Sequence, residues 1–441
     1  MSFARSALAN RFSAMIITAA TATLSLPLAA APTVEGALSS VQGDARVAKA
    51  LEALRADDGR TFTEQKHIAQ IPSPPFKEKV RAEYYLKRFQ ELGLKDASIA
   101  PEGYVIATRK GSGQGPQLVV SAHLDTVFPE GTDLTLKEKD GKTYGPGIGD
   151  DARGLAALLS VIDALNKSGI ETVGDLVFVG TVGEEELGNL RGVKALFKDR
   201  QGIDGFISVD GIDVRRIVNR GTGSHRYEMT FKGPGGHSFA EFGRPSAIHA
   251  MGRAIAKIAE VRPPKEPKTT FTVGTVQGGT SVNAIAGEAR LTLDMRSNEE
   301  AALLAEEKEI LALVQDAVKE ENKRWDTDQI SVDIKLIGDR PAGGTAEDSP
   351  MVQTAQRSIA AVTNGAKVTL SGGSTDSNTA MSLGVPAMTI SGGGEGGSAH
   401  SLAEWYKPVD AYQGPQNVLL TSLTLVGVKG VSEPVLQAHG K

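Results

Sequence analysis

Apolar residues occur along this chain in two arrangements, continuous runs and helical stripes. Continuous apolar runs are typical of strands that are buried on both faces. Such runs cover residues 117–122, 175–182, 206–209 and 385–390. One of the stripes, with the spacing of an amphipathic helix, consists of Leu155, Leu158, Ile162 and Leu165. This alternation predicts an α/β fold with an open, mostly parallel sheet, flanked by helices, that binds ligands beyond the carboxyl ends of its strands.

The pattern changes between residues 222 and 338. In the run 288–296, apolar residues alternate with polar ones, which predicts a strand with one covered and one open face. Further expected elements are strands at 227–231, 270–277 and 330–337 and helices around Met251 and Leu311. We therefore predict an α+β domain at 222–338, inserted between the parts 32–221 and 339–441 of the first domain.

Two details of the first domain are also predicted. Residues 32–60 are polar and rich in alanine, so we expect a loose lead-in to a helix near 47–54. The strands at 104–108 and 117–122 are joined by a glycine-rich turn, and we expect them to be neighbours in the sheet.

The amino terminus has the order of an export signal. Arg5 and Arg11 precede a mostly apolar stretch at 14–30, and Ala29-Ala30-Ala31 offers the small residues that cleavage requires. Polar residues and a proline interrupt the apolar stretch, which suits a cleaved signal better than a permanent span. We predict a signal peptide at 1–31 and a periplasmic or secreted protein with no membrane attachment after cleavage. A disordered tail is the alternative.

Composition sets limits on function. The chain has 441 residues, too many for a single compact core, which predicts two domains. Its formal charge is −5 and it has no basic tract, which argues against nucleic acid as a partner. The absence of cysteine excludes disulfides, cysteine metal sites and a cysteine nucleophile. A protein without disulfides is compatible with a bacterial periplasm.

The first candidate site lies at the end of the run 117–122. His123 and Asp125 follow this run, and side chains at positions i and i+2 of a strand point to the same face. A neutral imidazole is a common metal ligand, and a nearby carboxylate fixes its tautomer and orientation. The alternative is that these two side chains only bond to each other.

Further candidates stand beside glycines or at strand ends. Asp150 lies in a glycine-rich loop directly before a helix, where the helix dipole stabilises a carboxylate; a helix cap is the alternative. The others are Glu184 and Glu185 after the run 175–182, Asp210 after the run 206–209 and His400 after a run of glycines. A solvated surface segment is the alternative for the glutamates, and a flexible linker is the alternative for the glycines.

Two imidazoles and several carboxylates fit a pair of divalent ions. Zinc is favoured, and cobalt and manganese are alternatives. One carboxylate that bridges both ions gives the two-metal arrangement, with a spacing of about 3.5–4 Å, that generates hydroxide at neutral pH and polarises a carbonyl.

The order of the motifs resembles a known family, the co-catalytic zinc exopeptidases and deacylases. This family includes glutamate carboxypeptidase of the G type, peptidase T, acetylornithine deacetylase and succinyl-diaminopimelate desuccinylase. The resemblance covers nearly the whole mature chain. It rests on His123-Leu-Asp-Thr, Gly145-x-Gly-x-x-Asp150-Asp, Gly183-Glu-Glu, Ser208-Val-Asp210, Gly235-Gly-His237-Ser and Ala399-His400-Ser-x-x-Glu404. Each motif is weak alone, whereas all of them in this order are specific.

The resemblance implies a role for each metal-site candidate. Asp150 bridges the metals, His123 and Asp210 complete one site, and Glu185 and His400 complete the other. Asp125 is implied as a partner that orients His123. Glu184 is implied as the general base that takes a proton from the metal-bound water. A third acid, Glu186, leaves the assignment of Glu184 and Glu185 open by one position.

The resemblance also implies that the inserted domain is a lid and dimerisation domain. His237 would stabilise the oxyanion of the reaction, from its own chain or from a partner subunit, and a turn histidine is the alternative. Asn283 and Arg296 would grip the substrate, Arg296 by pairing with a carboxylate.

The implied activity is that of a dimetal exopeptidase, which hydrolyses short peptides or N-acylated amino acids through a metal-bound hydroxide and acts as a homodimer. Whether it is a carboxypeptidase or an aminopeptidase stays open. One alternative is an N-acyl-amino-acid deacylase, an amidase that removes a small acyl group. An alternative of another class is a catalytically inactive relative that binds peptides.

Overall fold

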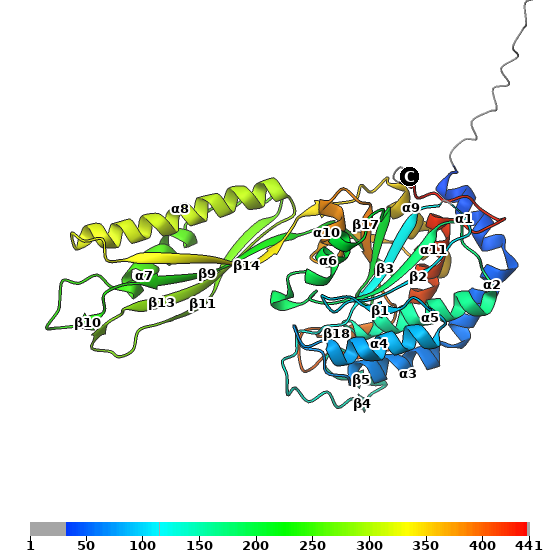
Figure 1. The fold of residues 1–441 in the computed structure, drawn as a ribbon, viewed down its shortest axis with the longest axis horizontal. Helices are drawn as coiled ribbons and strands as arrows, with labels where there is room; N and C mark the ends of the chain where they lie inside the picture. The colour runs from blue at the N-terminus through cyan, green and yellow to red at the C-terminus, as the bar shows by residue number, and fades with distance from the viewer. Residues whose placement is uncertain (1–31, 114, 439–441) are drawn as a thin grey trace, which may run out of the picture. The chain divides into compact units, whose positions relative to one another are not determined.

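A mixed β-sheet forms the centre of the first domain (Figure 1). The structure is a computed structural model that describes residues 32–113 and 115–438, so the predicted signal peptide lies outside the described residues. The strands follow the order β1-β2-β6-β3-β7-β17-β8-β15, with β16 beside β8. Their bounds are β1 Ser98–Ile99, β2 Val105–Arg109, β3 Gln117–His123, β6 Asp175–Thr181, β7 Gly205–Val209, β8 Arg216–Gly221, β15 Gly343–Gly344, β16 Thr369–Gly373 and β17 Ala387–Ile390. Because β6, β3, β7 and β17 pair in parallel, the predicted α/β fold is confirmed.

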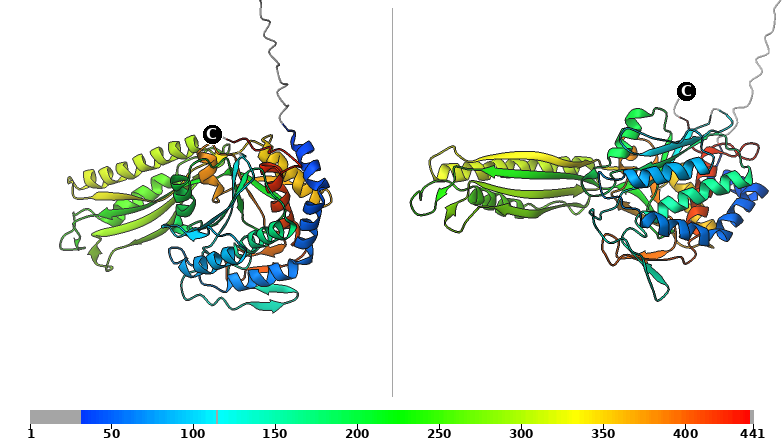
Figure 2. Two further views of the ribbon diagram at one scale, coloured as in Figure 1. Left: turned by 45° about the vertical axis from the view of Figure 1, so that its right-hand side comes forward. Right: turned by 60° about the horizontal axis from the view of Figure 1, so that its bottom comes forward.

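Helices cover this sheet because its inner strands are apolar throughout. Leu118, Val119 and Val120 of β3 are fully buried, and helices α5 and α11 both pack against this strand. Helices α3, α4 and α5 lie side by side (Figure 2). The helices of this domain are α1 Val34–Gly43, α2 Ala45–Ala56, α3 Asp58–Ala69, α4 Lys79–Glu91, α5 Ala152–Ser168, α6 Arg191–Asp199, α9 Pro350–Val362, α10 Ser377–Ser382 and α11 Gln413–Val426, with a 3-10 turn, η1, at Glu186–Gly188.

Two sequence-based expectations for this domain were wrong. The helix predicted near 47–54 is present as α2, but residues 32–60 are no loose lead-in to it, because α1 and the start of α3 occupy the residues on either side. Thr33 caps α1, and Asp44 caps α2 by accepting hydrogen bonds from the backbone N–H groups of Arg46 and Val47. Strands β2 and β3 are not neighbours, because β6 lies between them, antiparallel to β2 and parallel to β3.

The inserted segment has its own sheet, with strand order β11-β13-β9-β14. The bounds are β9 Gly223–Lys232, β11 Thr269–Gly278, β13 Glu288–Ser297 and β14 Ser331–Arg340, with helices α7 Ala247–Ala259 and α8 Glu300–Arg324. Both helices pack on the face to which Leu291 and Met295 point, and there they enclose a separate hydrophobic core. The other face carries Asp294 and Arg296, as the alternating pattern predicted.

The inserted sheet has a base and a tip. β9 starts directly after β8, and β14 ends shortly before β15, so Ser224 and Arg340 pair at the base. At the tip, β10 (Gly236–His237) pairs with β12 (Ala284–Ile285). The boundaries 222 and 338 of the insert remain predictions.

A small sheet with strand order β18-β19-β5-β4 joins two distant parts of the chain. Its strands are β4 Lys137–Lys139, β5 Lys142–Tyr144, β18 Glu395–Gly397 and β19 Trp405–Lys407. The glycine run after β17 therefore contains a paired strand and is no flexible linker.

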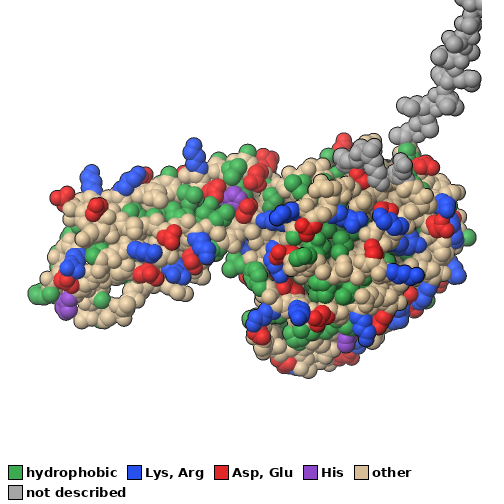
Figure 3. Space-filling view, viewed as in Figure 1, with side chains coloured by type: hydrophobic (Ala, Val, Ile, Leu, Met, Phe, Trp, Pro, Cys, Tyr) green, Lys and Arg blue, Asp and Glu red, His purple; other side chains and the backbone are tan. Residues whose placement is uncertain are grey.

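The surface charge is mixed. Figure 3 shows acidic and basic side chains interspersed over the viewed face, without a large block of one sign. Among the described residues, no helix combines the length and the apolar composition that crossing a membrane requires.

Candidate metal centre

The central sheet brings three of the candidate segments to one edge. His123 is the last residue of β3, Glu184 and Glu185 follow β6, and Asp210 follows β7. Because β6, β3 and β7 are parallel neighbours, their carboxyl ends lie at the same edge. The side chains that follow these strands therefore lie close together.

The small sheet delivers the other two candidates. Asp150 follows β5, and His400 lies in the turn between β18 and β19. β19 pairs with β5, and the N–H of Gly145 donates to the carbonyl of Glu404 at 3.0 Å. This pairing brings together two residues that are 250 positions apart in the sequence.

Asp150 lies between the two imidazoles. Nε2 of His123 is 2.9 Å from Oδ1 of Asp150, and Nε2 of His400 is 3.0 Å from Oδ2. Each histidine thus faces a different oxygen of the same carboxylate. The helix cap is the neighbouring residue, since Asp151 accepts the N–H of Gly154 at 3.0 Å. The carboxylate of Asp150 therefore does not cap helix α5 and can contact both imidazoles.

Glu185 joins this group. Its Oε1 lies 3.2 Å from Nε2 of His400. His123, Asp150 and Glu185 offer one ligand atom each, all within 4.8 Å of one another. Asp210 lines the same cavity, which has a volume of about 740 Å³.

Asp125 acts on its surroundings in two ways. Its backbone carbonyl lies 3.0 Å from Nδ1 of His123, while its carboxylate is 3.8 Å from that nitrogen. The carboxylate instead accepts the N–H groups of Glu184 at 3.2 Å and Glu185 at 2.8 Å. The carbonyl leaves Nε2 of His123 facing Asp150, and the carboxylate holds the loop that follows β6.

The three consecutive glutamates have different surroundings. Glu184 and Glu185 are buried, whereas Glu186 is exposed and has a left-handed φ of 49°. Glu185 lies against His400, and Oε1 of Glu184 is 3.6 Å from Nη1 of Arg340. This geometry favours Glu185 over its neighbours as a ligand.

The electrostatics of the cavity indicate an excess of negative charge. Burial and the carboxylate of Asp150 raise the pKa of Asp210 to about 7. Burial, then Glu185, raises the pKa of Glu184 well above its ordinary value, and burial likewise raises the pKa of Glu185. Hydrogen bonds to Asp150 and Glu185 raise the pKa of His400 to about 11.

These residues fit divalent cations. Nitrogen and carboxylate ligands suit zinc, cobalt and manganese. The clustered carboxylates of Glu184, Glu185 and Asp210, whose pKa values are raised, are the groups whose charge a cation would compensate. The structure brings His123, Glu185 and His400 together at Asp150, and Asp210 lines the same cavity; their role as metal ligands stays a prediction.

Sequence reasoning missed the residues that support this centre. Glu404 accepts the N–H groups of Gly147, Gly149 and Asp150 at 2.9, 2.8 and 3.1 Å, and so holds the loop that carries Asp150. The spacing His400-x-x-x-Glu404 was visible as part of a motif, but its contact was not.

Two further acids and an arginine were also missed. Asp151 accepts the N–H of His123 at 3.0 Å, and buried Asp376 accepts the hydroxyl of Thr181. Arg340 donates to the carbonyl of Glu184. No local signal marks these contacts, because the partners lie far apart in the sequence.

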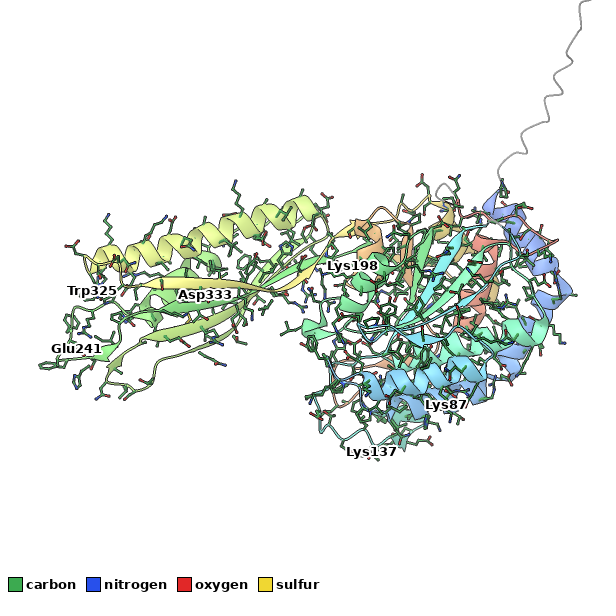
Figure 4. All side chains as sticks on the ribbon, viewed as in Figure 1. Lys87, Lys137, Lys198, Glu241, Trp325 and Asp333 are labelled. Atoms are coloured by element: carbon green, nitrogen blue, oxygen red, sulfur yellow. The ribbon has the colours of Figure 1, made fainter. Side chains whose placement is uncertain are left out.

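The predicted substrate-binding residues are not together. Arg296 lines the cavity that also holds Asp150. His237 and Asn283 are exposed at the tip, where the N–H of Ser238 donates to the carbonyl of Asn283 at 3.0 Å. The N–H of His237 donates to Glu241, which Figure 4 labels at the tip of the inserted domain. Within one chain, the structure thus separates His237 and Asn283 from the candidate metal centre.

Comparison with known proteins adds a family. The model of peptidase family M20/M25/M40 matches residues 119–423. Acetylornithine deacetylase from Myxococcus xanthus is 28% identical over 332 residues, which are 72% of this chain and 82% of that protein.

Solved structures share the fold. A tripeptidase from Staphylococcus aureus superposes with a TM-score of 0.69 at 23% identity and covers 82% of this chain and 97% of its own. A dinuclear metal binding peptidase from Bacillus subtilis superposes with a TM-score of 0.61 at 17% identity and covers 84% of this chain and 99% of its own. At these identities the likeness shows the fold.

Proposed function

The chain belongs to peptidase family M20/M25/M40 and is a peptidase-type hydrolase, and from this premise we propose that it uses two divalent ions, zinc first among them, to hydrolyse short peptides or N-acylated amino acids. The observation that carries the proposal is the position of Asp150. An imidazole faces each of its oxygens, at 2.9 and 3.0 Å. A carboxylate in this position is suited to bridge two ions.

The proposed ligands would divide between the two ions. His123 and Asp210 would hold one ion, Glu185 and His400 would hold the other, and Asp150 would serve both. When bound, the ions polarise the scissile carbonyl and lower the pKa of the attacking water. Of the proposed ligands, His123 and Glu185 are buried, Asp150 and Asp210 are half-buried, and His400 is exposed at the cavity.

Glu184 moves the proton. It lies beside Glu185 in the same cavity, and no hydrogen bond to either imidazole engages its carboxylate among the described residues. A free carboxylate at this place takes a proton from the attacking water and passes it to the leaving amine. Arg340, 3.6 Å from Oε1 of Glu184, opposes the rise in the pKa of Glu184 that burial and Glu185 cause.

The inserted domain binds the substrate. Arg296 faces the cavity and pairs with a substrate carboxylate. His237 and Asn283 act from a second copy of the chain in a homodimer. This assignment is supported by the exposed apolar side chains beside them, Phe239 at 89% and Val282 at 103% exposure, because exposed apolar clusters mark interaction sites.

The substitution Glu184→Gln tests the mechanism. The variant keeps the shape of the side chain and the metal ligands, so it should fold and bind both ions, while kcat falls by about 10²–10⁴-fold. Metal content and turnover are measured on the same sample. A variant with near-normal kcat would show that Glu184 is not the base.

Two further experiments separate the alternatives. A panel of dipeptides, tripeptides and acyl-amino acids, with zinc, cobalt or manganese restored after chelation, distinguishes an exopeptidase from a deacylase. The similarity to acetylornithine deacetylase supports the deacylase as the alternative activity. Metal analysis distinguishes both from an inactive peptide-binding relative, which has no need for two stoichiometric ions.

The place of action is part of the proposal. We expect cleavage of the segment 1–31 and a periplasmic or secreted mature protein. Amino-terminal sequencing of the protein from an expressing bacterium, after separation of periplasm and cytoplasm, tests this. An intact amino terminus in the cytoplasmic fraction would contradict it.

A further inference from the structure

The loop after β6 is held from two sides. This loop, residues 183–190, carries both glutamates of the proposed centre. From the central sheet, the carboxylate of Asp125 accepts the N–H groups of Glu184 and Glu185. From the base of the inserted sheet, the guanidinium groups of Arg226 and Arg340 both donate to the carbonyl of Glu186.

The carbonyl of Glu186 belongs to a part of this loop where the backbone conformation is strained. Glu186 has a left-handed φ of 49°, and so do Asn189 and Leu190, each at 57°. Residues other than glycine reach this conformation at a cost, and they keep it only when neighbouring groups hold them. The bond from Arg226 is one of the contacts that hold it.

Arg226 is in turn connected to Arg296. Asp294 of β13 lies opposite Arg226 of β9. Its Oδ1 accepts Nε of Arg226 at 2.9 Å, and its Oδ2 accepts Nε of Arg296 at 2.8 Å. All three side chains line the cavity of the proposed centre. One carboxylate therefore joins the arginine that faces the substrate to the arginine that holds the loop.

We infer that Arg226 and Asp294 are positioning residues that couple a substrate carboxylate on Arg296 to the placement of Glu184 and Glu185. The inference rests on the proposed function for the role of Arg296. A substrate carboxylate on Arg296 competes with Asp294 for the guanidinium and changes the charge that Asp294 presents to Arg226. The bond from Arg226 to Glu186 then transmits this change to the loop. Arg226 itself need not touch the substrate.

The anchoring is tested by hydrogen exchange on the full-length, metal-free protein. In Arg226→Met, the segment 183–192 should exchange about tenfold faster, as expected from the loss of a hydrogen bond from a charged donor. The matched control is Arg290→Met. Arg290 lies on the same face of β13, pairs with Glu228 at 3.4 Å and lies outside the cavity. Exchange in Arg226→Met equal to wild type would overturn the anchoring, whatever the enzyme hydrolyses.

The coupling is tested by kinetics with metal restored, on the best substrate of the panel. Arg226→Met should lower kcat about tenfold with little change in KM, and Arg226→Lys, which keeps a donor, should recover part of the loss. Arg296→Met should raise KM and lower kcat. In the double variant, the two losses in kcat should not add, since both act through one path.

The outcomes separate the two claims. Additive losses in kcat would overturn the coupling through Asp294. The C-terminal amide of the same substrate is a second probe, because without a carboxylate the effect of Arg296→Met on kcat should disappear. If wild-type protein with metal hydrolyses no member of the panel, the proposed function fails, and the exchange experiment still decides whether Arg226 holds the loop.

Discussion

The candidate metal centre and the tip of the inserted domain differ in how much of a site one chain contains. At the edge of the central sheet, His123 and His400 each lie within hydrogen-bond distance of the carboxylate of Asp150. At the tip, His237 and Asn283 are exposed. Both groups belong to motifs of the same family resemblance.

The difference follows from the way each group is positioned. Parallel strands bring the residues that follow β3, β6 and β7 to one edge of the central sheet, and the pairing of β19 with β5 brings Asp150 and His400 together. A side chain at the tip of the inserted domain has no such constraint, since the tip strands β10 and β12 pair with each other and not with the central sheet. Within one chain the metal-centre candidates therefore meet, whereas the action of His237 and Asn283 from a second copy is a proposal to be tested.

The largest effect is expected from removing Asp150, the residue that we propose is shared by two metal sites. Asp150→Ala should reduce the metal content below two ions and lower kcat/KM by at least about 10³-fold, because several kcal/mol of transition-state stabilisation are lost. Metal analysis and kinetics on one sample measure both. Asp133→Ala, at an exposed aspartate of the loop before β4, is the control. Two bound ions in the Asp150 variant would show that Asp150 is not required at the candidate metal centre.

The second prediction concerns the tip. His237→Ala should keep both ions and lower kcat by about 10²–10³-fold, as expected for the loss of an oxyanion donor. His249→Ala is the control, since His249 is an exposed histidine on helix α7 of the same domain. An unchanged kcat for His237→Ala would show that His237 is a turn histidine without a role in catalysis.

Mixing experiments then show which subunit supplies His237. Glu184→Gln has a dead centre but an intact tip, and His237→Ala has the reverse. If His237 acts across a homodimer, an equal mixture should recover about a quarter of wild-type activity, from hybrids with one working site. If His237 acts within its own chain, no activity returns.

More of the candidate metal centre than of the tip could be predicted from the sequence, and the reason is physical. His123 and Asp210 stand directly at the ends of apolar runs, so the local pattern is enough to place them. Asp150 and His400 meet through β5 and β19, strands of three residues each, which are too short to give a periodic signal. Their meeting was implied only by the family resemblance.

Other errors share this cause. The order β2-β6-β3 was not predicted. The glycine-rich turn between β2 and β3 is a local signal, whereas the order of strands depends on pairing between distant segments. The three bonds of Glu404 join residues more than 250 positions apart. The fold class was thus open to prediction, as was the choice of the candidate ligands, whereas the residues that hold these candidates in place were not.

The third prediction tests one of these supports. Glu404→Gln replaces one acceptor oxygen by a donor, which must face the N–H groups of the loop that carries Asp150. Metal affinity should fall by about 10–100-fold, as for other groups that orient ligands. Glu395→Gln, at an exposed position of β18, is the control. Metal titration measures the affinity, and wild-type affinity in the Glu404 variant would show that the loop is held without it.

The smallest effect concerns His225, at the base of the inserted sheet. Asp150 lies between two imidazoles, whereas His225 lies between two carboxylates. Nδ1 of His225 is 3.1 Å from Glu307, and Nε2 is 3.6 Å from Asp339. The carboxylates face opposite ring nitrogens and cannot converge on one ion. The bond to Asp339, which outweighs burial, and the charge of Glu307 raise the pKa of His225.

The sign of the pH effect follows from this raised pKa. Protonated His225 stabilises the fold at pH values below about 6.5, the ordinary pKa of histidine, and this contribution is lost as the pH rises through the higher pKa of the folded state. The difference in free energy of unfolding between wild type and His225→Gln should therefore be larger at low pH. Asp339 is half exposed, so solvent screening limits the difference to about 1 kcal/mol. Urea unfolding of both proteins without metal at several pH values measures it, and a difference that grows with pH would show that His225 is neutral in the folded chain.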